Sequence, residues 1–109
     1  MAATAIADHA MPHLRLDSYI LDTLMPDLVG HDRRPSAFLL YLLLWRRTHG
    51  AGDKTAAIAL EDLAELAGLS KRTVQGNLRW LRSRRLITIR RDAPTDVGRF
   101  TVLEPWKRS

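Results

Sequence analysis

Residues 64–75 read AELAGLSKRTVQ, and this stretch decides the fold that we expect for the chain. Gly68 can take the positive φ that ends a helix, and Leu69 follows it as an apolar plug. Ser70 is a strong N-cap candidate, because its hydroxyl can accept a hydrogen bond from a free N–H group of the next helical turn. The stretch therefore predicts a helix, a tight turn and a second helix.

The second helix is expected to run from Ser70 to about Arg85, with one apolar and one largely cationic face. Its apolar stripe recurs at helical spacing and consists of Val74, Leu78 and Leu81. The other side and its borders carry Lys71, Arg72, Gln75, Gly76, Arg79, Arg82 and Ser83. Arginine and glutamine side chains suit phosphates and base edges. This order predicts a helix-turn-helix with a recognition helix.

Positive charge is concentrated in one part of the chain. The whole sequence has a net charge of +5, but residues 70–91 hold eight Lys or Arg and no Asp or Glu. The remainder is therefore net negative. Such asymmetry indicates a polyanionic partner, with nucleic acid first and an anionic membrane surface second.

Length and composition set limits on the class of protein. A chain of 109 residues with 46% hydrophobic content predicts one folded domain. It contains no cysteine, which excludes disulfides and thiolate metal sites. The longest apolar run, residues 37–45, is too short for a bilayer span of about 20 residues, and it predicts a buried helix. His9 and His13 have metal-like spacing but straddle Pro12 in an Ala-rich start, so we expect no metal site.

The other elements follow from local patterns. Asp17 or Ser18 can cap a first helix, which we expect to kink or end at Pro26, and residues 30–35 read as a polar turn. The stripe Ile20, Leu21, Leu24, Met25 and Leu28 predicts core packing, with a dimer interface as the alternative. The remaining expected segments are a helix from 35 or 36 to about 49, a short strand over 56–60, a helix over 61–67, and strands over 86–91 and 99–103 that form a hairpin.

With these elements in this order, residues 36–104 resemble the winged-helix family of bacterial DNA-binding proteins. The likeness is carried by Leu63-Ala64, Gly68-Leu69-Ser70, Val74, Leu78, Leu81, Leu86-Ile87 and Gly98-Arg99-Phe100. Residues 60–74 are similar to the motif of small prokaryotic regulators and of phage and plasmid replication initiators. The segment 14–45 looks more like the initiators. The resemblance implies a mainly α fold with a small β-hairpin (α+β), a winged helix-turn-helix.

Two residues of the expected recognition helix depart from the family pattern. Gly76 costs a helix about 1 kcal/mol relative to Ala, and its bare backbone either allows close approach to DNA or is tolerated without benefit. Asn77 stands where the family usually has a small apolar residue, so it either hydrogen-bonds inside the domain or makes another contact. Trp80 lies off the apolar stripe, and we expect it to pack within the domain against the N-terminal segment or Trp106, with contact to a second subunit as the alternative.

The Ala-rich start predicts a flexible tail, residues 1–13, and the rest is expected to be a single winged-helix domain with an N-terminal helical extension, residues 14–109. Base readout is assigned to Arg72, Thr73 and Gln75, with Arg79 next, because N-terminal residues of a recognition helix reach deepest. The arginines of the wing, about 90–99, either contact DNA or only solvate the hairpin, and Asp92 and Asp96 argue against deep insertion. The predicted DNA-binding residues are Ser70, Lys71, Arg72, Thr73, Gln75, Arg79, Arg82, Arg90, Arg91 and Arg99.

The function expected from these features is sequence-specific binding of double-stranded DNA by a transcriptional regulator. One alternative is a DNA-binding module of a plasmid or phage replication-initiation or partition protein. Another is a protein-interaction winged helix without DNA binding. We expect a homodimer in the cytoplasm, associated with the nucleoid. The sequence holds no Gly-rich phosphate loop and no context for a nucleophile. We therefore expect no enzyme activity, cofactor, small-molecule ligand or membrane partner.

Overall fold

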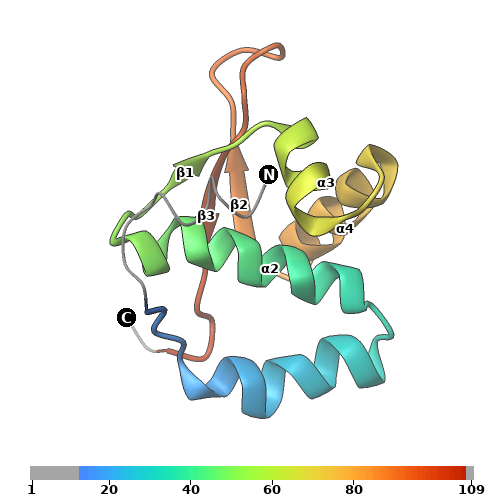
Figure 1. Cartoon of the computed structure of the whole chain (residues 1–109), viewed down its shortest axis with the longest axis vertical. Coiled ribbons are helices and arrows are strands. Elements are labelled where there is room, and N and C mark those ends of the chain that lie inside the picture. Colours follow the sequence, from blue (N-terminus) through green and yellow to red (C-terminus); the bar gives the residue numbers. More distant parts are fainter. Residues whose placement is uncertain (1–12, 108–109) are drawn as a thin grey trace.

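The computed structural model of the chain describes residues 13–107. Its helices lie in layers beside a small antiparallel sheet (Figure 1), so the α+β class is confirmed. The described part forms one body of 33 × 30 × 29 Å. The predicted tail, residues 1–13, lies outside the described residues except for its last position, and so do His9 and Pro12.

The helix–turn–helix predicted for residues 61–85 is present. Helix α3 spans Leu60–Ala67 and ends at Gly68, whose φ of 68° is the left-handed conformation expected there. Helix α4 spans Lys71–Ser83. Its N-cap is Ser70, whose Oγ accepts a hydrogen bond of 3.1 Å from the Thr73 N–H. The two signals that predicted the turn, a glycine and a capping serine, are thus both used.

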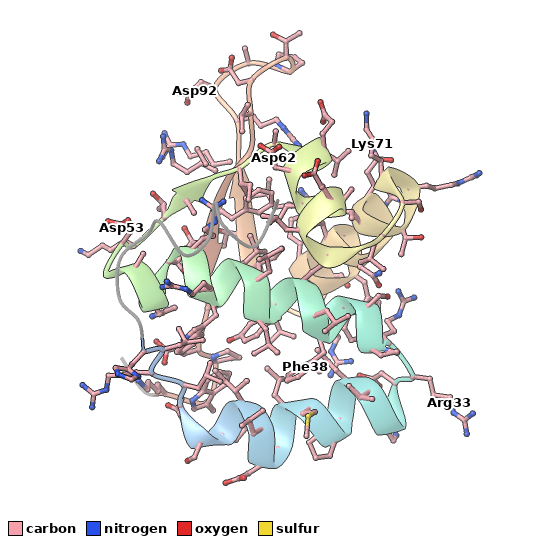
Figure 2. The ribbon with its side chains drawn as sticks, in the orientation of Figure 1. Arg33, Phe38, Asp53, Asp62, Lys71 and Asp92 are labelled. Carbon is pink, nitrogen blue, oxygen red and sulfur yellow. The ribbon has the colours of Figure 1, made fainter. Side chains whose placement is uncertain are left out.

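Helix α2, Pro35–Arg47, is the central layer and confirms the helix predicted from the apolar run. It packs against α4 and α3 on one side and the N-terminal helical segment on the other (Figure 1). Phe38 is buried and points from α2 toward that N-terminal segment (Figure 2). Tyr41 is also buried, and its hydroxyl donates a 2.8 Å hydrogen bond to the Leu103 carbonyl. Helix α2 is therefore tied to the segment that follows the sheet.

Of the two outcomes expected for the N-terminal helix at Pro26, a kink or an end, the end is wrong, because the chain stays helical past this residue. It forms two stretches of π-helix, η1 (Ile20–Leu24) and η2 (Pro26–His31). Proline lacks an N–H and its ring clashes with the carbonyl four residues earlier in an α-helix. The wider π turn removes that conflict: the Met25 N–H bonds to the Ile20 carbonyl, five residues back. Residues 30 and 31 are consequently helical rather than part of a polar turn.

The predicted core role of the N-terminal stripe is confirmed for three of its five residues. Ile20, Leu24 and Leu28 are buried. Leu21 and Met25 are exposed and form, with Val29, a second apolar row on the outer side of this segment. These three residues therefore face solvent, on the side of the segment opposite the residues that pack in the core.

Three short strands form the sheet in the order β1–β3–β2. They are β1 (Ala56–Ala57), β2 (Ile87–Arg90) and β3 (Arg99–Val102), all antiparallel to their neighbours. Register places Ile87 opposite Val102, and both are buried in the core. The loop of the β2–β3 hairpin projects from the body (Figure 1). The predicted edge strand and hairpin are both present, although each strand is shorter than expected.

The two ends of the described chain meet on the side of the molecule away from the hairpin loop. Tyr19 stacks on Trp106 with ring centroids 4.6 Å apart. The Trp106 indole N–H donates to a carboxylate oxygen of Asp17 at 3.2 Å. Lys107 Nζ lies 3.6 Å from Asp17 and 2.9 Å from Glu104. Trp106 is therefore the neighbour of Tyr19 and not of Trp80. Within residues 13–107 no helix has the length and apolar character needed to cross a bilayer.

Candidate nucleic-acid interface

Helix α4 buries one side and exposes a cationic one. Val74, Leu78 and Leu81 are buried, which confirms the predicted apolar stripe. The predicted site residues on this helix and at its N-cap are all exposed: Ser70, Lys71, Arg72, Thr73, Gln75, Arg79 and Arg82. A helix whose hydrophobic side fixes it to the core and whose other side is basic is well placed to meet a polyanion.

The N-terminal end of α4 carries positive charge where the helix dipole is already positive. Its first turn holds Lys71 and Arg72 and no acid, whereas the first turn of α3 holds Glu61 and Asp62. Cations at a helix N-terminus are unfavourable by a few tenths to about 1 kcal/mol each. Glu61 offsets part of this charge, since its carboxylate lies 4.0 Å from Lys71 Nζ. An anion bound at this end would remove the remaining repulsion.

A groove joins α4 to the base of the hairpin. It has a volume of about 280 Å³, and its polar lining comes from Gln75, Arg79, Arg82 and Arg91. Its floor includes Leu78 and Ile89. The structure thus brings one predicted hairpin residue, Arg91, together with three predicted residues of α4.

The other two hairpin arginines lie elsewhere. Arg90 and Arg99 are direct cross-strand partners. Both are exposed, while the alternate residues Ile89 and Phe100 face the interior. They line a separate hollow of about 430 Å³ together with Asp92 and other hairpin residues. Arg91 therefore lies on the opposite face of the hairpin from the Arg90–Arg99 pair, because neighbouring residues in a strand point to opposite faces.

The structure places the two residues that departed from the family pattern. A Cβ built on Gly76 meets no atom within 4 Å beyond its own helix and chain neighbours, so packing does not require glycine there. Asn77 is only 5% exposed and lies on the buried side of α4. Its amide donates a 2.7 Å hydrogen bond to Ser36 Oγ, and its carbonyl accepts one of 3.3 Å from Arg34. Asn77 therefore fastens α4 to the start of α2.

Trp80 contacts two arginines, Arg34 and Arg84, neither of which is among the predicted DNA-binding residues. The Arg34 and Arg84 guanidinium carbons are 4.9 and 5.0 Å from its ring centroid, within cation–π range. Arg84 follows Trp80 by four residues, so helical spacing was a usable signal for that contact. Arg34 is 46 positions earlier, in the connector before α2, and no local pattern links it to Trp80.

One carboxylate belongs to this cluster. Asp32 lies 2.9 Å from the His31 imidazole and accepts a 2.8 Å hydrogen bond from Arg84. The His31 hydrogen bond, followed by that of Arg84, lowers the pKa of Asp32 below its ordinary value. Asp32 is therefore ionised at neutral pH and holds Arg84 in place.

Among residues 13–107, no group of three or more His, Asp or Glu side chains is arranged to hold a metal ion. Comparison of the chain with protein-family models, curated proteins and solved structures finds no match.

Proposed function

We propose that this protein binds double-stranded DNA sequence-specifically as a winged-helix protein, in the first place as a transcriptional regulator. Helix α4 acts as the recognition helix and the β2–β3 hairpin as the wing. The observation that carries the proposal is the continuous basic surface formed by the exposed side of α4 and the groove that contains Arg91. Clustered positive charge of this kind favours a polyanionic partner over a neutral one.

The dimensions of α4 suit a major groove. Thirteen residues make a helix roughly 20 Å long, and a B-DNA major groove about 12 Å wide admits one helix. With Val74 and Leu78 fixed in the core, Arg72 and Gln75 point outward near the N-terminal end. Arg pairs with guanine and Gln with adenine through two hydrogen bonds each. These two residues, with Thr73 and then Arg79, are the proposed base readers.

Phosphate contacts are proposed for the cations around this surface. Arg82 and Arg91 border the groove between α4 and the hairpin. The charge of Lys71 is partly offset by Glu61, so Lys71 should contribute less to phosphate binding. Arg90 and Arg99 lie on the outer face of the sheet, so they are assigned to backbone contact only where DNA bends around the wing.

A homodimer remains part of the proposal. One copy measures 33 × 30 × 29 Å, and one turn of duplex is about 34 Å, so a single copy covers about one turn. A longer, two-fold symmetric site would need two copies. The exposed apolar row Leu21, Met25 and Val29 is compatible with such an assembly. Sedimentation of the protein with and without its DNA site would determine the stoichiometry.

The decisive experiment is selection of bound sequences from a random DNA pool, followed by binding measurements over a salt series. We expect an enriched motif and an affinity that falls linearly with salt on logarithmic axes. No binding at low salt would reject the proposed function. A motif found at promoters would support a regulator, whereas repeated copies at one origin would support an initiator.

Two substitutions separate base reading from phosphate contact. Arg72→Ala should relax preference at one position of the motif, at a cost of about 1–3 kcal/mol for the preferred base. Arg91→Ala and Lys71→Ala should weaken all sequences alike. Arg15→Ala is the matched control, because Arg15 is exposed and lines a hollow with Trp45 and Lys107 to which α4 contributes no residue. Equal loss on specific and unrelated DNA for Arg72→Ala would overturn the readout assignment.

A further inference from the structure

The side of α4 that faces away from the hairpin carries a stack of one aromatic ring and two guanidinium groups. Trp80 is half-buried, and the guanidinium carbons of Arg34 and Arg84 lie 4.9 and 5.0 Å from its ring centroid. Arg84 caps the end of α4, whereas Arg34 precedes α2. The stack therefore joins two distant segments at one edge of the proposed recognition helix.

Among residues 13–107, each guanidinium also donates one hydrogen bond to another side chain. Arg34 donates to Asn77 at 3.3 Å, and Arg84 donates to Asp32 at 2.8 Å. A guanidinium has five N–H donors, and stacking on a ring positions its plane without using any of them. Most donors along the edges of both groups are therefore left for an oxyanion. A rigid fork of this kind matches the oxygens of a phosphate.

The charge around the stack is positive. Arg33, Arg34 and Arg84 contribute three cations, and Asp32 is an acid that pairs with Arg84. Arg33 has a φ of 54°, a left-handed conformation that is energetically unfavourable for a residue with a Cβ. Its side chain extends into solvent beside the start of α2 (Figure 2). The backbone there aims a third cation outward next to the stack.

The position of the stack around α4 indicates what it meets. Trp80 lies about 140° around the helix from Gln75, which faces the groove shared with Arg91. A helix in a major groove has a sugar–phosphate backbone on each side. The hairpin side is supplied with Arg82 and Arg91. The opposite side is supplied with the Trp80 stack.

We infer that Arg34 and Arg84, held on Trp80, form a second phosphate-binding site for the DNA strand on the side of α4 away from the hairpin. The inference rests on the proposed function of α4. Phosphate contacts fix register and orientation and carry no base information. The stack is thus a positioning site that, with the wing, clamps the helix between two backbones.

The test measures the salt dependence of DNA binding for Arg34→Gln and Arg84→Gln. The slope of log affinity against log salt should decrease by about 0.9 for each lost contact. The affinity loss between 50 and 200 mM salt should then be about threefold smaller than for the native protein. Selected and unrelated DNA should respond alike. Hydroxyl-radical footprints should lose protection on one strand edge, and Arg91→Gln should lose it on the other.

Two controls separate charge from structure. Arg15→Gln makes the same charge change far from α4 and should leave slope and footprint unchanged. Arg34→Lys keeps the charge without the planar fork, so it should retain the slope, whereas a merely structural role would be lost in both variants of Arg34. If the native protein binds DNA and both Gln variants keep the native slope and footprint, the inference is wrong although the proposed function stands. If the native protein binds no DNA, the proposed function fails first.

Discussion

Gly76 is the residue at which folding and binding are expected to make opposite demands. Glycine inside a helix costs about 1 kcal/mol relative to alanine, and a Cβ at Gly76 would meet no atom beyond its own helix and chain neighbours. Gly76→Ala should therefore raise the free energy of unfolding by roughly that amount. It should also weaken DNA binding, because an added methyl group on the outer side of α4 would hold the duplex away.

Gly30→Ala is a matched control for this prediction. Gly30 lies in η2, away from α4, and likewise has no atom within 4 Å of a Cβ. Chemical denaturation should show both variants to be more stable than the native protein, while titration with DNA should weaken only for Gly76→Ala. Unchanged DNA affinity in Gly76→Ala would show that glycine is tolerated there without benefit.

Asn77 shows what a residue pattern leaves open. Its polarity inside an apolar stripe indicated an unusual role, and burial with bonds to Ser36 and Arg34 resolves it. Those partners are 41 and 43 positions away, and helical periodicity carries no information about them. The sequence pattern therefore identified Asn77 as unusual, but only the tertiary structure shows that it links α4 to the start of α2.

At the scale of the element, the N-cap of α4 gives a direct test. Ser70→Ala removes the acceptor of the Thr73 N–H and should lower the free energy of unfolding by about 1 kcal/mol. Ser70→Asp restores a capping oxygen and should recover stability. It should still weaken DNA binding, because it places negative charge beside the expected phosphates.

Ser83→Ala serves as the control at the other end of α4. Ser83 is exposed and its hydroxyl bonds only to the Trp80 carbonyl among the described residues, so its effect should stay within about 0.5 kcal/mol. The measurement is the free energy of unfolding in urea for the native protein, Ser70→Ala, Ser70→Asp and Ser83→Ala. Equal stability of Ser70→Ala and Ser83→Ala would contradict the capping role.

Elements whose ends depend on strong local signals were predicted well. Elements in which opposing conformational preferences compete were predicted less well. Gly68 and Ser70 defined the turn between α3 and α4 correctly, because φ and capping act within a few residues. Pro26 does not end the helix, which was one of the two expected outcomes, because a π turn accommodates proline. Strand positions were right, but the face of each arginine follows from register, which placed Arg91 and the Arg90–Arg99 pair apart.

At the scale of the whole molecule, the proposed DNA-binding surface and the junction of the two described chain ends lie on different sides. The basic surface of α4 and the hairpin lies away from the junction where Asp17, Tyr19 and Trp106 join the two ends of the described chain. The uneven charge along the sequence predicted a polyanionic partner, but only the fold shows that Arg79, Arg82 and Arg91 line one groove. The junction can therefore be altered without touching the proposed interface.

Asp17 makes stability depend on pH through this junction. Its pKa is lowered, first by the hydrogen bond from the Tyr19 N–H and then by that from Trp106, with Lys107 adding to the effect. A lowered folded pKa stabilises the protein above the ordinary aspartate value of about 3.9, and that stabilisation is lost as the pH falls through the folded pKa. Asp17→Asn should therefore melt at a lower temperature than the native protein at pH 7.

The difference in melting temperature should shrink as the pH falls below about 4, because the native carboxylate becomes protonated and resembles the amide. Asp22→Asn is the control, since Asp22 is exposed on η1 and makes no ion pair with another described residue. DNA affinity at neutral pH should be the same in all three proteins, because both positions lie away from α4. A melting difference between Asp17→Asn and the native protein that persists undiminished at pH 3 would mean that the junction depends on the shape of the side chain and not on its charge.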